Sequence, residues 1–274
     1  MDLKELNLYD LHIHTHFSGD SEAIPSAIAQ KAYEIGLAGI CFTDHMDLDY
    51  KETPGLFDLD IPAYKKEITF VKEQFADKLD INWGVELGLQ PYLAEKNAKI
   101  IAENDFDFVI GSTHSVHQVD LYYPAYYQGR KEDDCYREYF EETLKNAQSD
   151  VDFDVYGHLD FVVRYGPNKN KYYSYKKFAD VIDEILRTII SKGKGIELNM
   201  AGLKYGLGHA HPTMDTLKRY KELGGEIITI GSDGHAPEQI AWEFEKAPSI
   251  LSEAGFSYFT IYKNRKPEFK KIPR

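Results

Sequence analysis

Histidines and carboxylates recur through the sequence at the points where short apolar segments end. His12 and His14 follow the first such segment, Asp44 and His45 follow the second, and Glu86 ends the third. The later segments are followed by His114, His158, Glu197, Asn199, Asp233 and His235. A single histidine at such a point is more often structural than a ligand, but chance does not readily explain all seven segments together. Imidazole and carboxylate ligands without thiolates suit zinc, manganese or iron, so the pattern predicts a divalent metal site.

These residues are numerous enough to bind more than one metal ion, and a pair of metal ions suits chemistry on a phosphate ester. Residues i and i+2 of a strand point to the same face, so His12 and His14 can bind one ion or bracket two. Two metal ions about 4 Å apart can clamp a phosphoryl group and activate water. No serine lies in a G-x-S-x-G motif, and neither a P-loop nor a G-x-G-x-x-G motif occurs. We therefore expect hydrolysis without a covalent nucleophile.

The apolar segments themselves are typical of short buried strands. The expected strands are Leu8–His12, Gly39–Thr43, Ile81–Glu86, Phe106–Gly111, Phe153–Gly157, Gly195–Leu198 and Glu226–Gly231. Amphipathic helical patterns lie between them, for example over 61–79, 136–144 and 178–189. Repeated strand–helix units predict a parallel sheet, whose carboxyl edge is where active sites form. A distorted barrel of about seven strands is the first choice, and an open doubly wound sheet is the second.

Composition narrows the class of protein and its partners. The 274 residues contain no linker-like or low-complexity tract, which indicates a single domain that spans residues 1–274. The formal net charge of −13 argues against a nucleic-acid partner, and no apolar run approaches the roughly 20 residues that span a membrane. No signal peptide is recognisable, and Cys41 and Cys135 do not indicate a disulfide framework. We therefore expect a cytoplasmic location.

Six segments of the sequence resemble the motifs of the PHP family, named for polymerase and histidinol phosphatase. In order along the chain they are 10–15 (DLHIHT), 43–45 (TDH), 84–86 (GVE), 112–114 (STH), 157–160 (GHLD) and 231–235 (GSDGH). Each motif is weakly specific alone, but all six in order are highly specific, and the resemblance runs from about Leu8 to Phe256. It implies a distorted (βα)7 barrel, in agreement with the strand count.

The resemblance also implies a site with three divalent ions, which would be Zn, Mn or Fe. One ion would be bound by His12, His14, Glu86 and Asp233, a second by Glu86, His114 and His158, and a third by Asp20, His45 and His235. Glu86 would bridge two ions, and both Glu86 and Asp233 are assigned as catalytic. Asp20 departs from family members that have histidine at this position.

Within the family, the chain length and segment 197–203 (ELNMAGL) look most like the stand-alone histidinol-phosphatases. These enzymes hydrolyse L-histidinol phosphate to L-histidinol and phosphate in histidine biosynthesis, so the implied partner is a small phosphate monoester. Attack by a metal-bound hydroxide is the implied mechanism. Two alternatives stay open: a phosphoesterase acting on mononucleotides or oligonucleotides, and a metal-binding regulatory or scaffold protein with a degenerate site.

Two residues are candidates for substrate contacts. Arg164, six residues after His158, could grip two phosphate oxygens or could be a surface arginine. His117, three residues after His114, could touch the phosphate or lie solvated in a loop.

Several other polar residues are expected to play supporting roles or none. His16, His209 and His211 are expected not to be ligands, and Asp10 and Asp44 to orient ligand imidazoles. A tyrosine cluster could cap the pocket or pack a long loop; it comprises Tyr122, Tyr123, Tyr126 and Tyr127. Segment 202–206 (GLKYG) is expected to be a loop without a phosphate-binding role.

Overall fold

The structure is a computed structural model that describes residues 3–273. Its strands are β1 (Tyr9–Ile13), β2 (Gly39–Phe42), β3 (His45–Met46), β4 (Asp80–Gly88), β5 (Phe108–Ser112), β6 (Ser115–Val116), β7 (Val119–Asp120), β8 (Val155–Tyr156), β9 (Gly195–Asn199), β10 (Ile228–Gly231), β11 (Tyr258–Lys263) and β12 (Lys266–Lys271). Its α-helices are α1 (Leu3–Leu6), α2 (Pro25–Ile35), α3 (Ile61–Gln74), α4 (Ala94–Glu103), α5 (Glu132–Gln148), α6 (Ala179–Ser191), α7 (Ala201–Lys204), α8 (Met214–Glu222) and α9 (Ala247–Glu253).

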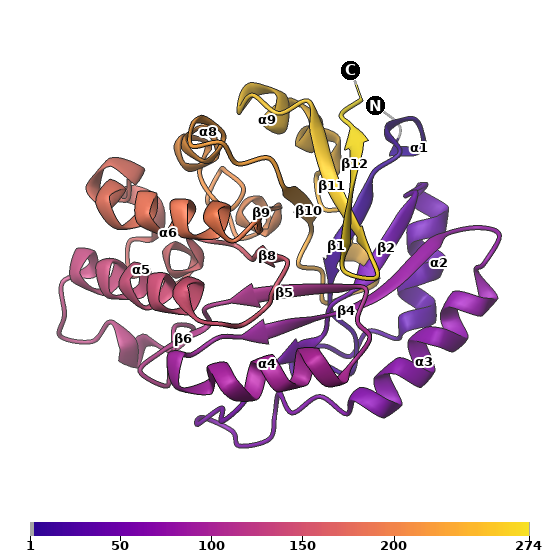
Figure 1. Ribbon diagram of the computed structural model, residues 1–274, viewed down its shortest axis with the longest axis horizontal. Helices are drawn as coiled ribbons and strands as arrows, with labels where there is room; N and C mark the ends of the chain where they lie inside the picture. The colour runs from indigo at the N-terminus through magenta and orange to yellow at the C-terminus, as the bar shows by residue number, and fades with distance from the viewer. Residues whose placement is uncertain (1–2, 274) are drawn as a thin grey trace.

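Seven parallel strands form a nearly closed barrel with helices around it (Figure 1). Their order is β1-β2-β4-β5-β8-β9-β10, and short β3 pairs with the carboxyl end of β4. The two ends of the sheet approach each other after the last residues of β1 and β10. There the His14 amide donates to the Gly234 carbonyl at 2.9 Å, and the Asp233 amide donates to the His12 carbonyl at 2.9 Å. The expected distorted barrel is therefore confirmed, and the open doubly wound sheet was the wrong alternative.

Apolar stripes on the helices hold them against the barrel. In α6, the predicted stripe of Ile182, Ile185 and Ile189 is buried, with 1% or less of each residue exposed. Burial of such side chains contributes about 1.5–3 kcal/mol each before entropic costs. The strands are buried along almost their whole length, as expected for a parallel sheet covered by helices. This packing gives the carboxyl ends of the strands a rigid frame.

A C-terminal hairpin, β11–β12, closes the opposite end of the barrel and was not expected from the sequence. Its two-residue turn, Asn264-Arg265, has φ of 48° and 61°. The turn amides donate to Asp107, just before β5, and the Arg265 side chain donates to Asp154, just before β8, at 2.6 Å. The strand signal was missed because β12 is charged and the turn lacks the glycine that usually marks a two-residue hairpin.

No helix within residues 3–273 combines the length and the apolar character needed to cross a membrane.

Candidate metal centre

Glu86 on β4 lies at the centre of a ring of histidines. Its Oε1 is 2.9 Å from Nε2 of His158 and 3.2 Å from Nε2 of His114. Its Oε2 is 3.1 Å from Nε2 of His12 and 3.1 Å from Nδ1 of His45. Burial opposes ionisation of this carboxyl, but the surrounding histidines, His12 first, hold its pKa well below the usual range. Nε2 of His14 also lies 3.5 Å from Oε2. The two oxygens of this anionic carboxylate therefore face five imidazoles.

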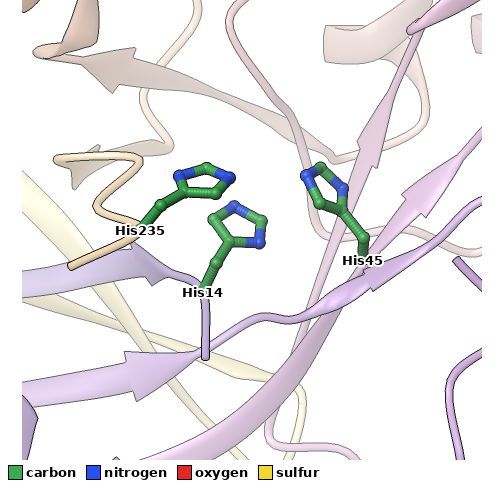
Figure 2. Close-up of side chains that lie close together, drawn as sticks. All are labelled: His14, His45 and His235. Carbon is green, nitrogen blue, oxygen red and sulfur yellow. The ribbon is translucent and has the colours of Figure 1, made fainter. Parts of the chain in front are cut away.

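A second group of histidines is stacked beside this carboxylate. Figure 2 shows His14 between His45 and His235. The ring centroid of His14 lies 4.2 Å from that of His45 and 4.1 Å from that of His235. Asp20 Oδ2 lies 3.2 Å from Nε2 of His235 and 3.7 Å from Nε2 of His45. Burial, His235 and His45 hold the pKa of His14 well below its usual range, so its imidazole is neutral and has a lone pair to offer.

Asp233 links the two groups and has an unusual backbone. Its φ of 54° is in the left-handed region, which aspartate tolerates better than most residues. Three contacts hold this conformation: the amide donates to the His12 carbonyl, Lys204 Nζ donates to the Asp233 carbonyl at 2.8 Å, and both terminal nitrogens of Arg164 donate to Oδ2 at 3.1 Å. The other carboxylate oxygen, Oδ1, lies 3.5 Å from Nε2 of His14. The strained turn therefore aims Oδ1 at the histidines.

The donor set fits divalent metal ions. Nε2 of His12, Nε2 of His14 and Oε2 of Glu86 are buried and form no hydrogen bond with any group in residues 3–273. Buried polar atoms without partners are costly, and convergent lone pairs are what a metal ion requires. Ligand atoms lie within 4.8 Å of one another in four groups: His12-His14-Glu86, Glu86-His114-His158, His14-His45-His235 and His45-Asp47-His114. Seven of the nine residues expected as ligands are in these groups, and the other two, Asp20 and Asp233, lie 3.2 Å from His235 and 3.5 Å from His14. The structure thus brings all nine together, while their division among individual ions stays a prediction.

Hydrogen bonds on the far side of two imidazoles fix their orientation. Nδ1 of His12 lies 2.7 Å from Glu197 Oε1, and Nδ1 of His114 lies 2.7 Å from Asp47 Oδ1. With Nε2 facing the cluster, Nδ1 is the nitrogen that carries the proton. Carboxylate partners of this kind make a ligand imidazole more basic and fix its tautomer. Asp47 was missed by the sequence reasoning; its only signal was its place two residues after His45.

Asp10 and Asp44 differ in what they position. Asp44 Oδ1 accepts a hydrogen bond from Ser18 Oγ at 2.7 Å, and that hydroxyl lies 3.1 Å from Nδ1 of His14. Asp44 therefore acts through Ser18 on the imidazole of His14, a predicted ligand. Asp10 instead accepts from the backbone amides of Ser232 at 2.9 Å and Ala241 at 2.8 Å. The expectation that it orients an imidazole was wrong, because its carboxylate anchors the loop after β10.

The metal centre opens into a cavity of about 350 Å³. Arg164 lines it from the short 3-10 helix Phe161–Arg164, and only 4% of the residue is exposed. Its guanidinium lies over the ring of Tyr205, 4.4 Å from the centroid. Segment 202–206, expected to be a loop, begins inside α7, and Tyr205 directly after this helix reaches the cavity. Arg164 is thus no surface arginine.

His117 lies away from the cavity. With Gln118 it forms the two-residue turn between β6 and β7, where φ is 51° and 63°. Its side chain is 61% exposed, and Nε2 is 3.4 Å from Glu138 Oε1. The turn directs the imidazole outward, so the structure does not bring His117 to the phosphate side of the site.

Of the remaining candidate residues, some line the cavity and others lie away from it. His16 pairs with Glu67 at 3.4 Å, and His211 pairs with Asp160, so neither belongs to the four ligand groups. His209 contacts the neighbouring Ala210 carbonyl at 2.8 Å. The tyrosine cluster splits: Tyr122 and Tyr123 line the cavity, whereas Tyr126 and Tyr127 are buried in the protein.

Proteins of similar sequence include histidinol-phosphatases. The chain is 33% identical to a histidinol-phosphatase of Lactococcus lactis subsp. lactis over 94% of its own length and 95% of the relative. It is also 33% identical to a probable histidinol-phosphatase of Clostridium acetobutylicum, over 88% and 91% of the two chains.

Solved structures similar to this one include a histidinol phosphate phosphatase. The crystal structure of the Lactococcus lactis histidinol phosphate phosphatase, in complex with zinc, L-histidinol and phosphate, superimposes with a TM-score of 0.88 and 31% identity, covering 96% of this chain and 99% of that one. A structure from Listeria monocytogenes, 17% identical with a TM-score of 0.73, shares the fold. The model of the PHP domain matches residues 10–201. The chain therefore belongs to the PHP domain family.

Proposed function

We propose that this protein is a metal-dependent histidinol-phosphatase, which hydrolyses L-histidinol phosphate to L-histidinol and phosphate. The observation that carries the proposal is the Glu86-centred cluster. Its ligand atoms have no hydrogen-bond partner in the described part of the chain, and they lie beside a cavity that is also lined by a buried arginine. The similarity to the Lactococcus lactis enzyme, over nearly the whole of both chains, supports the same substrate.

The nine clustered residues would hold up to three divalent ions, in the division stated above: His12, His14, Glu86 and Asp233 for one, Glu86, His114 and His158 for another, and Asp20, His45 and His235 for the third. Zinc, manganese and iron all suit these nitrogen and oxygen donors. When bound, the ions would attract the phosphate oxygens and lower the pKa of water at the site.

Arg164 is the protein's own cation for the phosphate. Both terminal nitrogens donate to Asp233, yet each has a second N–H, and Nε is buried without a hydrogen-bond partner in the described chain. A phosphate in the cavity can accept hydrogen bonds from these remaining N–H groups. The contact with Asp233 meanwhile holds the guanidinium at the edge of the metal cluster, so phosphate binding and metal geometry are coupled through one carboxylate.

The charge of the protein favours a small substrate. A net charge of −13 repels the backbone of a long nucleic acid, whereas one phosphate group can be neutralised locally by metal ions and Arg164. We also infer that residues 1–274 act as one domain, because the buried apolar side chains of the described residues form a single cluster that extends from α1 to the C-terminal hairpin.

The test is phosphate release by the metal-loaded protein from L-histidinol phosphate, AMP and a sugar phosphate. We expect the highest kcat/KM for L-histidinol phosphate. Glu86→Ala, purified in parallel, reports any contaminating phosphatase, because this variant should lose the activity. A higher kcat/KM for AMP would favour a nucleotide phosphoesterase, and no turnover of any substrate would favour a binding protein.

A further inference from the structure

One wall of the cavity is aromatic and acidic and contains none of the nine proposed ligands. It is formed by Tyr50, Asp120, Tyr122 and Tyr123. Tyr122 is 61% exposed, so much of its ring is open to the solvent. L-histidinol carries an imidazole ring and a primary amine that is protonated at neutral pH. Arg164 and the metal ligands account for the phosphate but leave these two groups of the substrate without a partner.

The β6–β7 hairpin fixes Asp120 next to the metal centre. Asp120 pairs with Ser115 across the hairpin, and Ser115 directly follows His114. The Leu121 amide donates to the His114 carbonyl at 3.1 Å, which ties the end of the hairpin to the same residue. These backbone hydrogen bonds therefore fix the position of Asp120 relative to the Glu86–His114 pair. A residue that recognises the end of a substrate far from the phosphate needs such a fixed position.

Among the described residues, Asp120 is also the cavity carboxylate that contacts no basic side chain. Its Oδ2 accepts from Tyr50 Oη at 2.8 Å and its Oδ1 accepts from the Tyr122 amide at 2.7 Å, both neutral donors. Across residues 3–273, no lysine, arginine or histidine forms an ion pair with it. Each of the other three carboxylates of the cavity contacts a basic side chain: Asp20 lies 3.2 Å from His235, Asp47 lies 2.7 Å from His114, and Asp233 lies 3.1 Å from Arg164. A carboxylate oriented by neutral donors is prepared to accept a cation from the substrate.

We propose that Asp120 binds the ammonium group of the substrate and that Tyr50, Tyr122 and Tyr123 surround its imidazole and methylene groups. This inference rests on the proposed function and deepens it, since it names the residues that select an amino-bearing phosphate monoester. Tyrosine rings attract both flat heterocycles and cations, so they complement the carboxylate.

The test compares two substrates and two variants. The substrates are L-histidinol phosphate and 3-(imidazol-4-yl)propyl phosphate, which has the same ring and chain without the amine. Asp120→Asn keeps the shape and an acceptor for the Tyr122 amide but removes the charge. It should lower kcat/KM for L-histidinol phosphate by about tenfold or more, chiefly through KM, the range for losing a charged hydrogen bond. The same variant should change kcat/KM for the deaminated substrate by less than about threefold.

Asp49→Asn is the matched control, because Asp49 is an exposed acid that pairs with Lys96 at 3.4 Å and does not line the cavity. It removes the same charge and should leave both substrates unaffected. Metal content, measured by elemental analysis, should be the same in all three proteins.

Product inhibition provides a second, independent measurement. L-histidinol should inhibit about tenfold more strongly than 3-(imidazol-4-yl)propan-1-ol, while inhibition by inorganic phosphate should be equal in wild type and Asp120→Asn. Equal inhibition by the two alcohols, or equal losses on both substrates, would overturn the role of Asp120 and leave the histidinol-phosphatase function intact. If the wild type hydrolyses other monoesters but not L-histidinol phosphate, the proposed function fails and this inference fails with it.

Discussion

Replacement of Arg164 by alanine tests whether a protein cation, in addition to the metals, binds the phosphate. The guanidinium is buried and donates twice to Asp233 at 3.1 Å, so its contacts are made away from bulk water. Loss of a buried charged contact costs about 2–4 kcal/mol here, which corresponds to a roughly 30- to 1,000-fold lower kcat/KM. Arg164→Lys should recover only part of this, because an ammonium cannot reproduce the forked donor geometry.

The assay must separate phosphate binding from metal binding, because Arg164 also holds Asp233. Loss of a group that orients a metal ligand typically weakens metal affinity by about 10- to 100-fold. Rates are therefore measured for wild type, alanine and lysine variants with metal in excess, and metal content is determined for each. Arg137→Ala is a control, since Arg137 pairs with exposed Asp180 on the surface. If Arg164→Ala keeps the wild-type kcat/KM at saturating metal, the metals bind the phosphate alone and the proposed contact is wrong.

Three further predictions concern the metals. Glu86→Ala should lose bound metal and activity together, because this carboxylate faces five imidazoles; near-normal turnover with full metal content would contradict its bridging role. Elemental analysis should find two to three equivalents of zinc, manganese or iron per chain, and chelation should lower both activity and the thermal midpoint, since ions that bind the folded state stabilise it; full activity of the metal-free protein would exclude the proposed chemistry. Glu197→Gln should weaken metal binding about 10- to 100-fold through the 2.7 Å contact with His12, and an unchanged metal titration would show that this contact does not tune the ligand.

The barrel and the ligand cluster could be predicted because both depend on local patterns. A buried parallel strand appears in the sequence as a short apolar run. The polar residue that ends this run marks the carboxyl end of the strand. This rule identifies His12 and Glu86 as candidates, and the resemblance to the PHP motifs then assigns them to metal ions. Since every strand of a barrel contributes its carboxyl end to one rim, seven separate positions in the sequence become one site.

Other residues could not be identified because their roles depend on contacts between distant segments. Asp47 lies 67 residues from His114, and nothing in the sequence indicates that their side chains meet at 2.7 Å. His117 was considered for the opposite reason: it is close to His114 in the sequence, but a turn with two positive φ values directs it outward. Proximity in sequence is informative at the end of a strand and misleading within a tight turn.

The two walls of the cavity differ in charge, and this difference bears on selectivity. Arg164 and the proposed metal ions provide positive charge at one part of the cavity lining, whereas Asp120 provides a negative charge that forms no ion pair within residues 3–273. A phosphate monoester that carries an ammonium group complements both walls. A sugar phosphate or a nucleotide leaves Asp120 facing a neutral group, and burial already raises the pKa of that carboxyl above its usual value. Such substrates would bury the charge further without a cation to compensate it, so the same residue that favours the amine also disfavours competing phosphate esters.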